Sequence, residues 1–105
     1  MIEEAKTWLV VFRDDPAMLE HRKAFGQQHI SYLQENRDTI ILAGGLRNKE
    51  ETPFAGGAWL VSANSTSDVE SLVQNDPYYN PEHRKYDISY WGIIQNSLSQ
   101  GASIE

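Results

Sequence analysis

Apolar residues along the chain alternate between short continuous runs and stripes that repeat every three or four positions. The runs are rich in β-branched, aromatic and aliphatic residues, a composition that is typical of strands. Four such runs predict strands at residues 7–12, 39–46, 56–63 and 86–94. The polar segment 47–54 joins the middle two runs, so we expect a hairpin there.

A stripe of apolar residues that includes His29 predicts the first helix, from about Pro16 to Asn36. Asp15 is suited to cap this helix, because its carboxylate can accept a hydrogen bond from a free amide of the first turn. Gly26 lies inside the helix, where we expect another backbone segment to approach closely. Residues three or four positions apart share one face: Met18, Arg22, Phe25, His29 and Leu33.

A shorter apolar stripe predicts the second helix at residues 67–75. Ser65 or Thr66 is placed to cap its start. Pro77 ends the helix, because a proline disfavours helical geometry in the residue before it, here Asp76. Asp76 is therefore expected just beyond the end of this helix.

The resulting order is β-α-β-β-α-β, the split βαβ arrangement of ferredoxin-like folds. We therefore expect an α+β fold in which a four-stranded antiparallel sheet carries both helices on one face. The 105 residues suffice for one domain, residues 1–105, with its core at about 6–94 and a loosely held tail at 95–105.

The predicted strands carry large apolar side chains on both faces of the sheet. In the first strand, Trp8 and Val10 alternate with Leu9 and Val11. Since the chain's own helices can cover only one face, this pattern predicts a homodimer in which two sheets pack face to face.

Composition narrows the possible partners and surroundings. The net charge of −6 disfavours binding to nucleic-acid phosphates or to anionic membranes. No apolar run approaches the roughly 20 residues of a membrane span. The acidic residues at 1–4 are unlike a signal peptide, so we expect a cytoplasmic protein. The absence of cysteine excludes disulfides and thiolate metal ligands.

The chain resembles the YciI-like (YCII-related) family over roughly residues 6–94. The resemblance rests on the order and spacing of several short motifs. These are the first strand, the helix with Arg22, His29 and Tyr32-Leu33, the Ala43-Gly44-Gly45-Leu46 turn, Gly57–Val61 and Asn75-Asp76-Pro77-Tyr78.

The resemblance implies a dimeric α+β barrel with a pocket in each subunit between helix and sheet. It also implies a His–Asp pair as the active site, by position His29 and Asp76. The best-understood type of member removes HCl from chlorinated aromatic intermediates, and the wider superfamily includes muconolactone isomerases and cofactor-free monooxygenases. The chain departs from many relatives in its longer segment 47–54, in Tyr79 and in its C-terminal tail, so the substrate stays open.

His29 and Asp76 have a chemical interpretation and an ordinary one. A histidine can take up and return a proton near neutral pH, and a carboxylate bonded to one ring nitrogen fixes its tautomer. Such a pair can abstract a proton next to a carbonyl without a metal or an organic cofactor. Alternatively, His29 is a core histidine bonded to a backbone carbonyl, and Asp76 caps the turn at Pro77.

Two further residues are candidates for substrate binding. Arg22, two turns before His29, could bind a substrate carboxylate. It could equally extend to solvent or pair with an acid such as Asp76. Tyr78 could present its hydroxyl to a substrate, with packing as the alternative, and the same choice applies to Tyr79, Tyr86 and Tyr90.

Other conspicuous residues have simpler explanations. The pairs Gly44-Gly45 and Gly56-Gly57 lack the spacing of phosphate loops, so we expect turns and bulges there. His21 and His83 are expected to be exposed, and no metal site is predicted.

Two functions are consistent with these patterns. The first is a cofactor-free lyase or isomerase that acts on a small carbonyl or aromatic-derived metabolite. In it His29 is the general base, Asp76 its acid or orienting partner, and Arg22 and Tyr78 contact the substrate. The second is a non-catalytic domain that binds a small ligand or has an accessory role. A His29–Asp76 distance of about 3 Å beside an open cavity favours the first.

Overall fold

The computed structural model describes residues 6–92 and has the element order that the sequence predicts. The elements are β1 (Lys6–Asp14), α1 (Met18–Glu35), β2 (Ile40–Leu46), β3 (Gly56–Ala63), α2 (Thr66–Asn75) and β4 (Arg84–Tyr90). The strands form one antiparallel sheet in the order β2-β3-β1-β4. This confirms the α+β, ferredoxin-like prediction. The last strand ends at Tyr90 instead of Ile94. Ile94 and the predicted tail at 95–105 lie outside the described residues.

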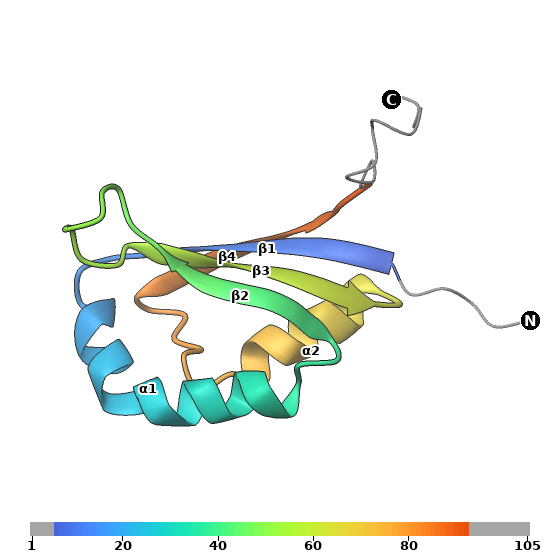
Figure 1. The fold of residues 1–105 in the computed structure, drawn as a ribbon, viewed down its shortest axis with the longest axis horizontal. Helices are drawn as coiled ribbons and strands as arrows, with labels where there is room; N and C mark the ends of the chain where they lie inside the picture. The colour runs from blue at the N-terminus through green and yellow to red at the C-terminus, as the bar shows by residue number, and fades with distance from the viewer. Residues whose placement is uncertain (1–5, 93–105) are drawn as a thin grey trace, which may run out of the picture.

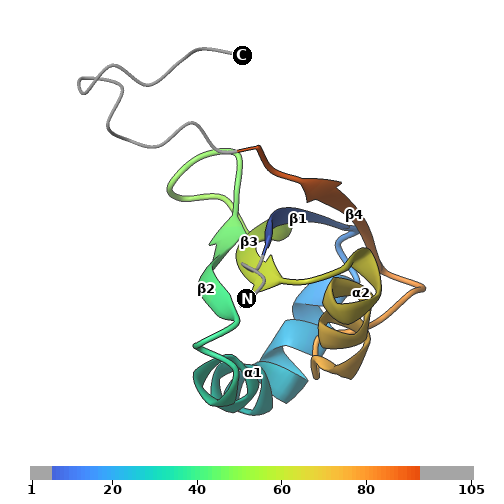
Figure 2. The same cartoon turned by 90° about the vertical axis from the view of Figure 1, so that its right-hand side faces the viewer.

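Both helices lie against the same face of the sheet (Figure 1). Seen after a 90° turn, no helix of residues 6–92 covers the opposite face (Figure 2). The covered face holds the core, in which alternate residues of β1 and β3 are buried and pack against α2. The register pairs Trp8 with Val61 and Val10 with Trp59, and these side chains meet Val69 of α2 in one cluster.

The two helix starts differ in how well the sequence predicts them. Ser65 caps α2 as expected, since its hydroxyl accepts a hydrogen bond from the Asp68 amide. Helix α1 begins at Met18, two residues later than predicted, and Ala17 occupies the cap position without a side-chain hydrogen bond. Asp15 accepts the Ala17 amide at 2.9 Å instead, so it closes a turn that leads into the helix.

Helix α1 meets the sheet along only part of its length. Met18 is its one fully buried residue within the described chain, and Phe25, predicted on the inward face, is 41% exposed. A cavity, described below, separates the middle of α1 from strands β2 and β3. No helix within residues 6–92 is long and apolar enough to cross a membrane.

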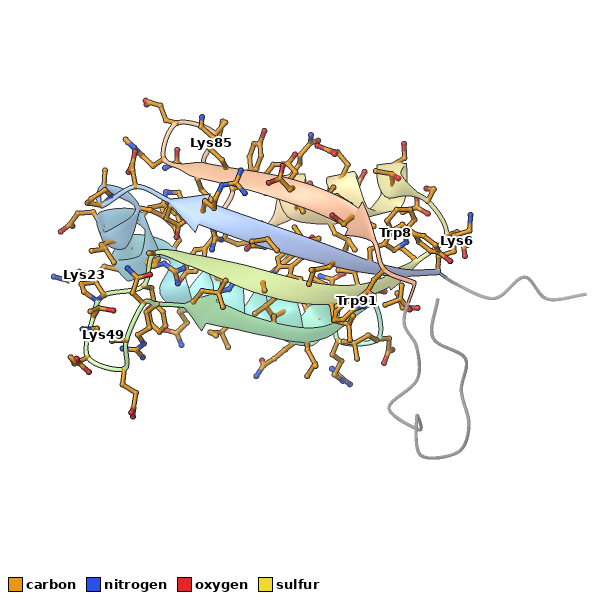
Figure 3. The ribbon with its side chains drawn as sticks, turned by 90° about the horizontal axis from the view of Figure 1, so that it is seen from above. Lys6, Trp8, Lys23, Lys49, Lys85 and Trp91 are labelled. Carbon is orange, nitrogen blue, oxygen red and sulfur yellow. The ribbon has the colours of Figure 1, made fainter. Side chains whose placement is uncertain are left out.

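The uncovered face of the sheet is apolar. Leu42 is exposed there, and Leu9, Leu60 and Trp91 help to line a shallow hollow on the same side. Figure 3 looks down on this face and shows the labelled Lys6, Lys49 and Lys85 at its edges, away from the centre of the sheet.

Candidate active site

A cavity of about 240 Å³ lies between α1 and the sheet. Its polar wall consists of Arg22 and His29 from α1, Tyr78 from the segment between α2 and β4, and Arg84 at the start of β4. The rest of the wall is aromatic, aliphatic or glycine. The volume is slightly below the range of roughly 300–1,000 Å³ typical of ligand pockets, which suits a compact, single-ring molecule.

His29 lines this wall and meets Asp76 behind it. The ring Nδ1 of His29 lies 2.7 Å from Oδ1 of Asp76, although 47 residues separate them. Asp76 is 4% exposed, and the same oxygen accepts the amide of Tyr78 at 3.1 Å. The long-range pair and the local turn predicted as alternatives for Asp76 are therefore both present.

The end of α2 explains why Asp76 points to His29. Asp76 is the C-cap residue, with an extended backbone (φ −70°, ψ 132°) that the following Pro77 enforces. The chain thereby leaves the helix and runs alongside α1 before it enters β4 (Figure 1). His29 sits in the middle of α1, at the level of this segment.

The acceptor character of Asp76 fixes the tautomer of His29. An ionised carboxylate can only accept, so in the neutral imidazole Nδ1 carries the proton and Nε2 keeps its lone pair. Nε2 makes no hydrogen bond with residues 6–92, and His29 lines the cavity. A proton acceptor is therefore available to a molecule bound there.

Tyr78 supports the histidine from one side. Its ring stacks on the imidazole of His29, with centroids 3.7 Å apart and planes at 8°. Its hydroxyl donates to the carbonyl of Arg22 at 3.3 Å, beside Gly26. A Cβ at Gly26 would lie 3.4 Å from that hydroxyl, so the close neighbour of this glycine is a side chain and not the expected backbone segment.

The YCII-related domain family matches residues 7–92 of this sequence. The chain belongs to this family. No protein of curated function matches the sequence significantly. Among solved structures, the chain is similar to 5-chloro-2-hydroxyhydroquinone dehydrochlorinase from Burkholderia phenoliruptrix, in complex with 2,5-dihydroxybenzoquinone. The two share 22% identity with a TM-score of 0.71, over 81% of this chain and 92% of that one. At this identity the similarity establishes the shared fold.

Arg22 pairs with Asp14, and not with Asp76 as one prediction had it. Its Nη2 lies 3.1 Å from Oδ2 of Asp14 and donates to the carbonyl of Gly56 at 2.6 Å. Arg84 Nε donates to the other oxygen of Asp14 at 2.8 Å. Burial lowers the pKa of the Arg84 guanidinium, and the adjacent Asp14 carboxylate opposes that shift. Two cations therefore share one buried carboxylate beside the cavity.

Sequence reasoning missed Arg84 and Asp14. The signal that identifies them is the β1–β4 register, which places Asp14 opposite Arg84. That register joins residues 70 positions apart, and no local pattern in the chain specifies it.

The glycine pairs are strand residues, and the prediction of turns and bulges there is wrong. Gly45 pairs with Gly57 across β2 and β3. A Cβ at Gly57 would lie 2.9 Å from the carbonyl oxygen of Gly44 and 3.1 Å from Nη2 of Arg84. A Cβ at Gly45 would lie 2.6 Å from the ring of Phe54. These glycines make room for side chains that line the cavity.

His21 is half-buried, which corrects the prediction that it is exposed. Its Nε2 donates to the carbonyl of Pro77 at 2.7 Å, and its Nδ1 lies 3.2 Å from the amide nitrogen of Asn80. The neutral ring satisfies both contacts, with Nε2 protonated. His21 therefore fastens the segment that carries Asp76 and Tyr78 to α1. His83 is also half-buried, and its Nδ1 pairs with Asp15 at 2.9 Å.

Tyr32 lies one turn beyond His29 and donates to the carbonyl of Leu72 at 2.6 Å. Burial, together with the negative charge of Asp76, raises the pKa of Tyr32 to about 12. A larger hollow of about 500 Å³ adjoins Tyr32, but its wall has no histidine or arginine. The smaller cavity is the better candidate because the charged groups converge on it. Within residues 6–92, no three His, Asp or Glu side chains are grouped as metal ligands.

Proposed function

We propose that this protein is a cofactor-free lyase or isomerase that acts on a small carbonyl or aromatic-derived compound. His29 is the general base, Asp76 orients it, and Arg22 and Tyr78 contact the substrate. One observation carries the proposal: a buried carboxylate holds Nδ1 of His29 at 2.7 Å, while the ring lines a cavity of about 240 Å³.

The proposed reaction begins with proton transfer to Nε2 of His29. The proton comes from a carbon next to a carbonyl, or from a hydroxyl conjugated with one. In a lyase, the released electron pair forms a double bond and expels a leaving group such as chloride, so the substrate loses HCl. In an isomerase, the pair moves to the carbonyl oxygen, and His29 returns the proton to a different carbon. Asp76 stabilises the imidazolium in both cases.

The fold relative supports the substrate class. That protein is a dehydrochlorinase of a chlorinated hydroquinone, a single-ring compound. A ring of this size suits the cavity, and the aromatic side chains of Phe12, Phe54 and Trp59 provide apolar walls for it.

The first test is chloride release from 5-chloro-2-hydroxyhydroquinone by the purified protein, followed by a panel of lactones and other chlorinated quinols. In the variant His29→Gln, the amide can still donate to Asp76 but cannot act as a base. We expect turnover to fall about 10²–10⁴-fold. His83→Gln is the matched control, because His83 also pairs with an aspartate but lies outside the cavity wall.

A folded His29→Gln protein with unchanged turnover would contradict the assignment of His29. Binding of ring compounds without any turnover across the panel would favour the alternative function, a non-catalytic ligand-binding or accessory domain.

We also propose that the protein forms a homodimer through the uncovered face of the sheet. The exposed Leu42, Leu46 and Trp91 support this, since an apolar face of this kind favours burial. Light scattering on the eluting protein measures the mass directly. We expect Leu42→Lys to shift it from dimer to monomer, and a monomeric wild type would contradict the proposal.

A further inference from the structure

The charged side chains that line the cavity, Arg22 and Arg84, are hydrogen-bond donors. Arg22 and Arg84 line it, whereas their shared partner Asp14 does not, and neither does Asp76. The negative charges that balance this region therefore lie behind the wall. A molecule in the cavity meets two guanidinium groups and one imidazole.

Both guanidinium groups lie close to the Tyr78 ring that stacks on His29. The central carbon of Arg22 lies 5.4 Å from the centre of the Tyr78 ring, and that of Arg84 lies 5.5 Å from it. The His29 ring lies 3.7 Å from the same centre. A single-ring molecule can therefore reach both arginines and the base together.

Asp14 fixes the arginines but leaves donors free. Arg84 binds Asp14 through Nε, and its two terminal nitrogens have no acceptor among the described residues, so they remain for one in the cavity. Arg22 binds Asp14 and Gly56 through Nη2, so its Nη1 has no acceptor among residues 6–92. An anion in the cavity can accept a hydrogen bond from such a charged donor.

We propose that Arg22 and Arg84, held by Asp14, form an anion clamp that selects the anionic form of a small oxygenated ring compound. The ligand is a planar anion with two oxygens, such as an ionised hydroxyquinone, because guanidinium groups bind paired oxygens in a fixed fork. The inference rests on the proposed function and names the charge of its substrate. The clamp also stabilises the oxygen charge that develops when His29 removes a proton.

The test compares two ligand pairs in calorimetric titrations of the wild-type protein. Each pair contains an anion and a neutral counterpart: 2,5-dihydroxybenzoquinone with 2,5-dimethoxybenzoquinone, and benzoate with benzamide. We expect the anion of each pair to bind at least about tenfold more tightly, as charge-assisted hydrogen bonds predict. Equal affinities within both pairs, or no binding of either anion at millimolar concentration, would overturn the clamp.

The variant Arg84→Gln tests whether Arg84 causes the preference for anionic ligands. We expect it to lose about tenfold or more in affinity for the anions and little for the neutral ligands. Arg13→Gln is the matched control, because it removes the same charge from an exposed arginine paired with Asp87. An equal loss for anionic and neutral ligands in Arg84→Gln would overturn the clamp. If circular dichroism shows Arg84→Gln unfolded, the wild-type ligand pairs decide the question alone.

Together with the turnover panel, these titrations separate the two proposals. Anion-selective binding without turnover of any compound in the panel supports the clamp and contradicts the enzyme. Turnover with no preference for anions supports the enzyme and contradicts the clamp.

Discussion

Two histidine–aspartate pairs of similar geometry lie in opposite surroundings in this protein. The nitrogen–oxygen distance is 2.7 Å in His29–Asp76 and 2.9 Å in His83–Asp15. The side chains of the first pair are 13% and 2% exposed, and those of the second are 35% and 48% exposed. Distance alone therefore does not distinguish a candidate site from a surface contact.

What differs is the rest of the environment. His29 has a tyrosine stacked on its ring and a cavity at its edge. His83 and Asp15 join the turn before α1 to the turn before β4, where water competes with the pair. Because the first pair is buried, breaking it is expected to cost more free energy than breaking the second. The second pair connects two loops at the surface.

Asp76→Asn is expected to have the largest effect on this comparison. The amide NH₂ can occupy the place of the acceptor, and His29 then favours the tautomer with its proton on Nε2, which cannot act as a base. We expect kcat for chloride release to fall about 10²-fold or more. Asp15→Asn, measured alongside, should leave kcat unchanged. Equal losses in the two variants would remove the distinction between the pairs.

Truncating each histidine tests the cost of burial. His29→Ala leaves the Asp76 carboxylate buried with only the Tyr78 amide as partner, so we expect a loss of about 3 kcal/mol in the free energy of unfolding. His83→Ala leaves Asp15 in water, and its urea midpoint should stay close to wild type. His29→Gln, which keeps a donor, should recover part of the loss. A smaller loss for His29→Ala than for His83→Ala would contradict the argument.

Alkaline titration of Tyr32 reports the charge of the buried pair. The pKa of Tyr32 is raised from 10.0 to about 12, first by burial and then by Asp76. Because the folded-state pKa is raised, its contribution to stability is full below pH 10 and is lost as the pH rises toward 12. The phenolate absorbance of wild type minus Tyr32→Phe isolates this group. Asp76→Asn should lower the pKa of Tyr32 without restoring its ordinary value, and Asp15→Asn should not move it.

The smallest effect is expected at the exposed pair. The hydrogen bond with His83 lowers the pKa of Asp15 below 3.8. A lowered carboxylate pKa stabilises the fold above pH 3.8, and the contribution is lost as the pH falls through the folded-state value. In His83→Ala, carboxyl ¹³C NMR should show the pKa of Asp15 rising back toward 3.8. An unchanged pKa would mean that the two side chains do not pair in solution.

The elements of the fold follow from local patterns. Periods of two and of about three and a half residues predicted the strands and helices, and Ser65 marked the start of α2 correctly. The predictions of the first helix cap and of turns at the glycine pairs were wrong, because each of these residue types is compatible with more than one local structure. Asp15 accepts an amide as predicted but in a turn before α1. The glycine pairs lie in strands, where a Cβ at Gly45, Gly56 or Gly57 would meet a close neighbour from another part of the chain.

The sequence predicts the candidate site less completely than it predicts the fold. The sequence placed His29 on the inward face of a helix and Asp76 at the end of another, and their catalytic role stays a prediction. Arg22 was identified with several possible partners, and Arg84 was not identified. With 9 basic and 15 acidic residues in the chain, composition cannot assign one partner to each charge.

The sequence by itself therefore determined the order of the elements and the positions of His29 on the first helix and of Asp76 just beyond the second. These depend on periodicity, on caps and on a proline, all of which act within a few residues. Only the tertiary structure decided that Asp14 holds two arginines, that Gly57 leaves space for Arg84, and that His21 fastens the segment with Asp76. The contacts of Asp14 with Arg84 and of His21 with Pro77 join residues far apart in the sequence, whereas the Arg22–Asp14 pair forms where β1 turns back into α1. Such contacts are set by how the finished layers pack, and no local pattern specifies them.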